Sequence, residues 1–152
     1  MDDYPEFAAD CISNALKGMP NALIGYYPNG VWTEGLGYWE FATEFLVRTS
    51  QSLSLTFGSD FNITKATGFE QTYEFPIHVN GYAAFNNYND VGESSLFTSP
   101  TMFWLANKFN EPGVAVVRKN IMDQQNTKAC ALDMIYCNIS QFEGKNTFPR
   151  DK

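Results

Sequence analysis

Histidine and cysteine, the side chains that most often build metal and nucleophilic sites, are scarce in this sequence. One histidine, His78, and three cysteines occur in 152 residues, and no Cys-x-x-Cys or other metal-ligand spacing is present. A zinc site built from this chain alone is therefore not expected, and neither is a disulfide framework, although a single bridge remains open. We expect no metal and no cofactor.

Positive charge is also scarce. Lysine and arginine number 10 against 17 aspartates and glutamates, which gives a net charge of −7. No basic stripe is available to neutralise phosphates, so nucleic-acid binding is not expected. The longest apolar runs, such as residues 114–117, are far too short to cross a bilayer, and the acidic residues 1–5 do not resemble a secretory signal. We expect neither a nucleic-acid nor a membrane partner.

Aromatic and aliphatic residues are plentiful, with 13 Phe, 8 Tyr and 3 Trp among 44% apolar residues. This composition can bury a core, and the length fits one domain, residues 1–152. Apolar residues recur every three or four positions in separate segments without sustained alternation, which predicts an all-α fold. Gly18 and Pro20 are expected to end the first helix, and Pro76 the third. The expected helices span about residues 4–17, 38–57, 65–75, 100–108, 111–122 and 127–139, and residues 79–99 are expected to form a loop.

The longest of these helices, residues 38–57, has the clearest pattern. Its apolar positions recur at helical spacing and predict one buried face. For the helix at residues 100–108, Ser99 as N-cap and Pro100 at the first helical position predict the start. The apolar positions of the long helix are Phe41, Ala42, Phe45, Leu46, Thr49 and Leu53.

A dense cluster of aromatic and polar residues, residues 29–41, leads from a loop into the first turn of this long helix. Two glycines allow the backbone to approach a ligand closely, and Trp32 and Tyr38 can flank the space. A tyrosine phenol has an ordinary pKa of about 10, so Tyr38 could donate a proton at neutral pH. The alternative is structural, with the ring of Tyr38 packed on the core and its hydroxyl bonded to a carbonyl.

The run from Tyr27 to Ala42, YPNGVWTEGLGYWEFA, resembles the Pro-Asp-Gly-x-Trp-x-Glu-Gly-x-x-Tyr-Trp signature of the heparinase II/III-like polysaccharide lyases, which include oligoalginate lyases. Residues 85–90 resemble an aromatic-Asn-x-x-x-Asp segment late in the toroid of these enzymes, and residues 101–106 resemble the helix after it. The resemblance extends over nearly the whole chain. It implies that residues 1–152 form the C-terminal part of an (α/α) toroid.

The resemblance also implies a function, the cleavage of an acidic, uronate-containing polysaccharide by β-elimination. In this family a proton leaves C5 of the uronate and the bond to the C4 oxygen breaks. Tyr38 matches the family's catalytic acid/base, which delivers a proton to the departing oxygen. Trp32, Glu34 and Tyr88 are expected to line the substrate cleft. The family further implies a bacterial periplasmic or secreted location.

Three departures from the family pattern bear on this expectation. The Asn/Gln-His group that neutralises the uronate carboxylate has no counterpart before Tyr38, the C-terminal β-sandwich is missing, and the usual aspartate of the turn is Asn29. We therefore expect this part alone to be inactive. A partial toroid leaves helix faces uncovered, so we expect either self-association through faces that carry Phe41, Phe45 and Phe103 or a molten state.

Two other functions stay open. The chain could be a non-catalytic carbohydrate-binding or scaffold segment, or Glu34 and Asp90 could form the carboxylate pair of an inverting glycosidase. In the structural alternative, Glu34 caps the long helix and Asp90 bonds its own loop. His78 suits proton transfer by type, but its apolar neighbours favour a structural role. Trp104, in mid-helix, is expected in the core.

Overall fold

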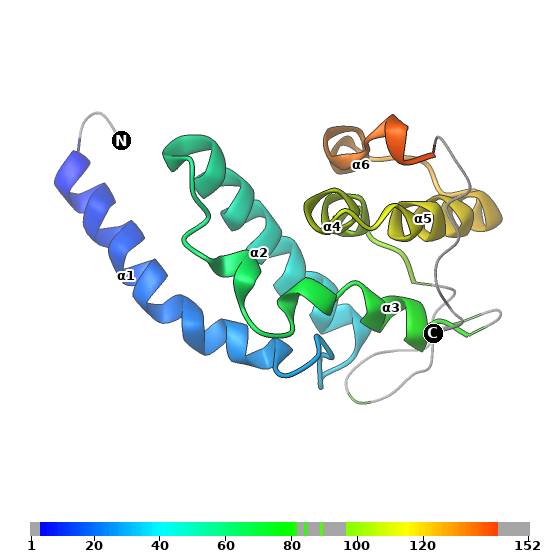
Figure 1. The fold of residues 1–152 in the computed structure, drawn as a ribbon, viewed down its shortest axis with the longest axis horizontal. Coiled ribbons are helices and arrows are strands. Elements are labelled where there is room, and N and C mark those ends of the chain that lie inside the picture. The colour runs from blue at the N-terminus through cyan, green and yellow to red at the C-terminus, as the bar shows by residue number, and fades with distance from the viewer. Residues whose placement is uncertain (1–3, 82–83, 85–88, 90–96, 143–152) are drawn as a thin grey trace.

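The computed structural model describes residues 4–81, 84, 89 and 97–142. The fold is all-α, as the sequence predicts (Figure 1). Short 3₁₀ turns follow α1, α2 and α6. The elements are α1 (Pro5–Leu23), a turn at Ile24–Tyr26, α2 (Leu36–Phe57), turns at Ile63–Lys65 and Phe69–Gln71, α3 (Glu74–Val79), α4 (Thr101–Phe109), α5 (Pro112–Gln125), α6 (Ala131–Tyr136) and a turn at Ile139–Phe142.

Helix α2 organises the molecule. It begins after Gly35 and ends at Gly58, which adopts a left-handed conformation that favours glycine and donates its backbone N–H to the carbonyl of Ser54. Its buried face packs on the segments that follow it and on α4. The buried residues of α2 are Leu36, Trp39, Thr43, Leu46, Val47, Ser50 and Leu53.

The predicted apolar face of α2 is partly wrong. Leu46 and Leu53 are buried, but Phe41 and Phe45 are exposed and contact each other edge to face, with ring centroids 4.9 Å apart. Both pairs obey helical spacing, and the spacing alone does not tell which of two neighbouring stripes faces the core. Trp39 and Val47, which are fully buried, fix the orientation of the helix instead.

Helices α4, α5 and α6 pack together at the end of the molecule opposite α1 (Figure 1). Phe103 of α4 is buried between the ring of Phe142 and the guanidinium of Arg118, so its expected place on an uncovered face is wrong. Trp104 is buried, as predicted, and its indole N–H donates to Gln51 of α2 at 2.8 Å. Helix α4 is therefore joined to α2 through Trp104, and to α5 and the C-terminal turn through Phe103.

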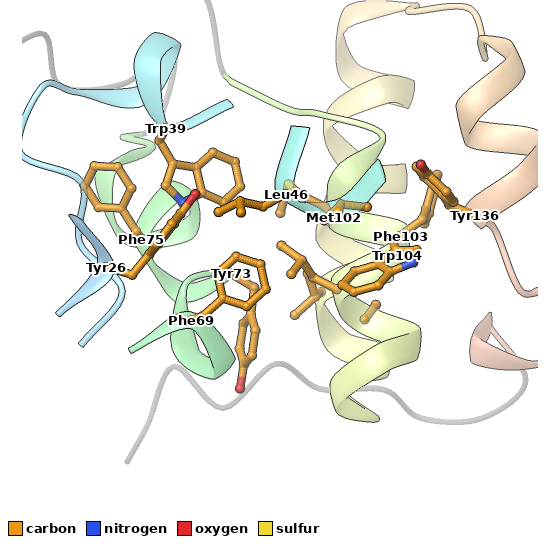
Figure 2. Packing of buried hydrophobic residues seen from close by; sticks show 14 of the residues in the cluster. Tyr26, Trp39, Leu46, Phe69, Tyr73, Phe75, Met102, Phe103, Trp104 and Tyr136 are labelled. Atoms are coloured by element: carbon orange, nitrogen blue, oxygen red, sulfur yellow. The ribbon is translucent and has the colours of Figure 1, made fainter. Parts of the chain in front are cut away.

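One continuous core runs through the molecule. Figure 2 shows Tyr26, Trp39, Phe69 and Phe75 gathered on one side and Phe103 on the other. At roughly 25 cal/mol per Å² of apolar surface removed from water, this burial is the main favourable contribution to folding. The core places the segment before α2 against the turns at residues 63–71.

Helix α1 is the least buried element and forms one side of the molecule (Figure 1). It has no fully buried residue, and it contacts the core through Ile12, Leu16, Met19 and Leu23. The expected end at Gly18 and Pro20 is wrong. Pro20 lies inside the helix, where its missing N–H costs one hydrogen bond, and the chain continues to Leu23 and the next turn.

Other helix limits also differ from the prediction. The segment at residues 65–75 forms two short turns rather than a helix, and Pro76 lies in the first turn of α3, where its missing N–H needs no helical partner. The helices expected at residues 100–108 and 111–122 are confirmed as α4 and α5. The start of α4 is one residue later than predicted, with Pro100 rather than Ser99 at the N-cap, although Ser99 Oγ lies 3.4 Å from the backbone nitrogen of Thr101. The helix expected at residues 127–139 shortens to α6.

The three cysteines form no disulfide with one another. None of the described helices is both long and apolar enough to span a membrane. Most of the loop expected at residues 79–99 lies outside the described residues.

Candidate functional site

The loop before α2 is held against the core by a relay of hydrogen bonds. The indole N–H of Trp39 donates to Thr72 Oγ1 at 2.7 Å, and Thr72 Oγ1 donates to the carbonyl of Gly30 at 2.9 Å. The backbone N–H of Gly30 donates in turn to the carbonyl of Tyr26 at 2.7 Å. The segment from residue 30 to residue 39 is therefore fixed at both ends, by Gly30 in the loop and by Trp39 in α2.

The position of Gly30 accepts only glycine. Its φ of 80° lies in the left-handed region, and a Cβ would come within 2.6 Å of the Thr72 Cα. Gly37, beside Tyr38, has nothing within 4 Å of the position of a Cβ. The sequence predicted a close approach of the backbone at Gly35 and Gly37. Gly35 is buried just before α2 with a φ of 96°, whereas Gly37 leaves open space at the surface, and the close approach to Thr72 occurs at Gly30 instead.

We expect the loss of this relay to destabilise the protein. Thr72→Val keeps the side-chain shape but leaves the buried Trp39 N–H without an acceptor, which should cost about 1–3 kcal/mol of unfolding free energy. Urea unfolding monitored by tryptophan fluorescence measures the change. Thr67→Val, at an exposed position, is the control and should change stability little. Equal stabilities for the two variants would contradict the relay.

Trp32 and Glu34 lie together. The indole N–H of Trp32 donates to Glu34 Oε2 at 3.1 Å, and its ring packs on Tyr26 with centroids 4.9 Å apart. Trp32 is half-buried and Glu34 is exposed. Tyr26 is fully buried, shares a hydrogen bond with Thr43, and burial raises the pKa of its phenol. The phenol of Tyr26 therefore stays protonated, and because it is fully buried it is not accessible to a ligand.

Tyr38 lies at the surface in the first turn of α2. Its side chain is 46% exposed, and its hydroxyl makes no hydrogen bond within the described part of the chain. The structural alternative, a ring packed on the core with the hydroxyl on a carbonyl, finds no support among the described residues. Tyr38 shares its stripe with the exposed Phe41 and Phe45, so three aromatic side chains line one side of α2.

Glu40 follows Tyr38 by two residues on α2 and is half-buried. Burial raises the pKa of the Glu40 carboxyl, while a hydrogen bond with Ser99 and the charge of Arg118 partly oppose the rise. Arg118 itself is buried in an ion pair with Asp133 at 2.7 Å, and Arg48 pairs with Glu44. Both of these cations are therefore already paired with carboxylates.

The raised pKa of Glu40 predicts a pH effect. A folded-state pKa above the unfolded value means that the folded chain binds this proton more tightly, so the stability contributed by Glu40 falls as the pH rises through that interval. Glu40→Gln should therefore gain stability relative to the natural chain between about pH 4 and pH 7. Unfolding in urea at both pH values measures the difference. Glu70→Gln, at an exposed position, should show no such trend.

Several predicted site residues cannot be placed with this group. Tyr88 and Asp90 lie outside the described residues, so neither the cleft position of Tyr88 nor a Glu34–Asp90 pair is tested. Their neighbour Asn89 is described, and its side-chain amide donates to the carbonyl of Thr33 at 3.0 Å. His78 is exposed in the last turn of α3.

Four apolar hollows are present on the described surface. Two, of about 430 and 760 Å³, follow α1, a third of about 370 Å³ lies along the C-terminal half of α2 with Ile12 of α1 at its edge, and a fourth of about 550 Å³ lies between α5 and α6. Trp32, Glu34 and Tyr38 line none of these four. Within the described residues, no group of three or more His, Cys, Asp and Glu could hold a metal ion.

Two features of this region escaped the sequence reasoning. Thr72 lies far from the motif in sequence, and the buried pair of Arg118 and Asp133 joins two helices whose partners no local spacing reveals. No model of a known protein family matches the sequence, and no curated protein matches it.

Proposed function

We propose that this chain is part of a polysaccharide lyase that cleaves uronate-containing glycans by β-elimination, with Tyr38 as the acid/base. The observation that carries the proposal is the exposure of Tyr38 next to a residue that anchors the helix in the core. Trp39, the next residue, is fully buried, while the Tyr38 hydroxyl is unbonded in the described part of the chain. The resemblance of residues 27–42 to the lyase signature supports the same role.

The reaction needs no oxidant or other co-reactant. The C5–H bond breaks and its proton passes to a base, its electron pair forms the C4–C5 double bond, and the C4–O bond breaks toward the departing oxygen. The phenol of Tyr38 protonates that oxygen, which prevents an alkoxide from leaving. Where the same tyrosine is also the base, its phenolate takes the C5 proton and returns it to the oxygen, so Tyr38 ends as it began.

Trp32 and Glu34 would line the cleft beside the phenol. The ring of Trp32 packs on Tyr26 and its N–H donates to Glu34, which fixes the half-buried indole at the base of the proposed cleft. The substrate carboxylate needs a cation or a hydrogen-bond donor, which we propose to come from residues outside this group. We also propose that the helices form part of an (α/α) toroid.

A non-catalytic carbohydrate-binding role is the second candidate. It is favoured by the pairing of Arg48 with Glu44 and of Arg118 with Asp133, which leaves neither cation for a uronate. A cleft without a cation stabilises no developing charge at C5, so it would bind a glycan without turnover.

One assay separates these functions. The native polypeptide that carries residues 1–152 is incubated with alginate, heparan sulfate or a neutral glucan, and ultraviolet absorbance of an unsaturated uronate is followed together with reducing ends. A lyase releases both signals together from an acidic glycan. Reducing ends without the double bond would indicate a glycosidase, and glycan binding without either signal would indicate the non-catalytic role.

A further inference from the structure

The hollow between α1 and the end of α2 has an apolar lining. Helix α1 contributes Ile12 and Leu16, while Phe57 and Phe61 come from the end of α2 and the segment after it. Its volume of about 760 Å³ is within the range of pockets that bind small organic ligands. The adjacent hollow of about 430 Å³ shares Leu16 and Phe61 with it, so the apolar lining continues along α1 toward Leu23.

Phe61 contributes to both hollows from a backbone conformation that phenylalanine rarely adopts. Its φ of 53° lies in the left-handed region, where a bulky side chain is strained. The backbone N–H of Phe61 donates to Ser59 Oγ at 3.0 Å, and its ring packs edge to face on Phe57 with centroids 6.1 Å apart. The ring is nevertheless 47% exposed. The fold therefore holds a strained, exposed aromatic ring where the two hollows meet, and strain of this kind is common at ligand sites.

The polar part of the lining is small and positively charged. Among the described residues, Ser13 and Lys17 are the only polar side chains that line the larger hollow, and no aspartate or glutamate lines either hollow. Lys17 is exposed and forms no ion pair within that part of the chain. On the whole chain, by contrast, acidic residues outnumber basic ones by 17 to 10. An apolar hollow with one free ammonium fits an apolar ligand that carries one negative charge.

Carboxylates near the hollow do not neutralise Lys17. Glu6 and Asp10, the acidic residues of α1, lie about 10 Å or more from Lys17 along the helix axis. Asp60, in the segment after α2, pairs with Lys108 of α4 at 3.4 Å. The ammonium of Lys17 therefore remains available to an anionic ligand.

The hollow between α5 and α6 provides a contrast. It also has an apolar lining and a lysine, Lys119. Lys119 forms an ion pair with Asp123, and Asp133 lines this hollow as well. Acidic residues outnumber basic ones there, so that hollow does not favour an anion.

We propose that the hollow between α1 and the end of α2 binds a free fatty acid. The ammonium of Lys17 and the hydroxyl of Ser13 bind the carboxylate, and the hydrocarbon chain packs along Leu16, Phe57 and Phe61. One polar end and an apolar chain match a lining whose polar groups lie one turn apart on α1. An amphipathic helix of another protein would instead need polar partners along both edges of the hollow. This site is separate from the proposed catalytic residue, so it does not rest on the lyase activity.

Three ligands with the same hydrocarbon chain test the selectivity for the charged end. Decanoate, decanol and decyltrimethylammonium are titrated below their micelle concentrations into the native polypeptide that carries residues 1–152, and calorimetry measures binding. We expect decanoate to bind about tenfold or more tightly than decanol, and the cation to bind most weakly, because only decanoate pairs with Lys17. Octanoate should bind more weakly than decanoate because it buries a shorter chain. Equal affinities for decanoate and decanol would overturn the proposal.

Three variants locate the ligand. Lys17→Glu should reverse the preference, so that decyltrimethylammonium binds more tightly than decanoate. Lys119→Glu makes the same charge change at the α5–α6 hollow and should leave the affinity for decanoate unchanged. Phe61→Asn should weaken decanoate about tenfold and keep the fold, because asparagine tolerates the left-handed backbone. A Lys17→Glu variant that still prefers decanoate, or a loss of binding in Lys119→Glu, would contradict the assigned site.

Two further measurements detect other occupants of the hollow. Sedimentation velocity with and without decanoate reports association, and a dimer that decanoate dissociates would assign the hollow to a second copy of this chain. Cosedimentation with vesicles of phosphatidylserine and phosphatidylcholine reports membrane binding, and retention on vesicles without binding of monomeric decanoate would assign a membrane surface. Either result, or a native chain that binds no decanoate, would overturn the proposal.

Discussion

Tyr38→Phe is expected to lower β-elimination turnover at least about a hundredfold in the native polypeptide that carries residues 1–152. The variant loses only the hydroxyl, which is the proposed proton donor to the departing oxygen. A hundredfold loss corresponds to roughly 2.7 kcal/mol of transition-state free energy. Formation of the unsaturated uronate under saturating glycan measures it.

The structure offers a matched control for this variant. Tyr27 lies in the loop that leads into α2 and is 67% exposed, so Tyr27→Phe removes a comparable phenol hydroxyl and should retain most of the activity. Neither change should shift the thermal midpoint noticeably, because the Tyr38 hydroxyl has no hydrogen-bond partner within the described chain. Near-native turnover by Tyr38→Phe would exclude Tyr38 as the acid/base and leave the binding role.

Asp133→Ala is expected to destabilise the protein by about 3–5 kcal/mol, the largest stability effect that we predict. Asp133 and Arg118 are each 3% exposed. Asp133 Oδ1 accepts from two guanidinium nitrogens of Arg118, at 3.1 and 2.7 Å, and Oδ2 accepts from the backbone N–H of Cys130 at 2.9 Å. The variant therefore leaves a buried cation without its partner and removes a cap from α6.

Two comparisons make this prediction sharp. Asp123→Ala breaks the exposed pair with Lys119 on α5, and its cost should stay below about 1 kcal/mol. Replacing both buried partners, with R118M/D133L, should recover much of the stability lost in Asp133→Ala because no unpaired charge remains. Urea unfolding measures all three variants. A double variant no more stable than Asp133→Ala would show that hydrogen bonds, rather than the unpaired charge, determine the cost.

The sequence predicted the helices more reliably than their faces. The pattern of residues 38–57 located α2 because its length and spacing suffice, but Phe41 and Phe45 were assigned to the buried side. Two neighbouring stripes of one helix satisfy the same period. Only tertiary partners, here the contact of Trp39 with Thr72, decide which stripe turns inward, and those partners lie 33 residues apart.

The errors at helix ends have a similar cause. Gly18 and Pro20 are strong local stop signals, yet Leu16, Met19 and Leu23 contact the core and hold α1 together across them. Tertiary packing here outweighs the local cost of a proline.

For the candidate site, the sequence named the residues, and their roles stay a prediction. The adjacency of Trp32 and Glu34 follows from their separation of two residues, and the surface position of Tyr38 agrees with the expected role. The buried environment of Glu40 could not be predicted, since Ser99 and Arg118 are distant in sequence. Tyr88 and Asp90 lie outside the described residues, and the cleft expected beside Tyr38 stays a prediction.

The anchoring of Trp39 affects how a ligand would bind at the neighbouring side chain, Tyr38. Since the indole is buried and tied through Thr72 to Gly30, the backbone that carries Tyr38 has already lost its conformational freedom when the chain folds. A ligand that reaches the phenol meets a preorganised support and spends little of its affinity on ordering that segment. Selectivity would then arise mainly from the fit of the ligand rather than from adaptation of the protein.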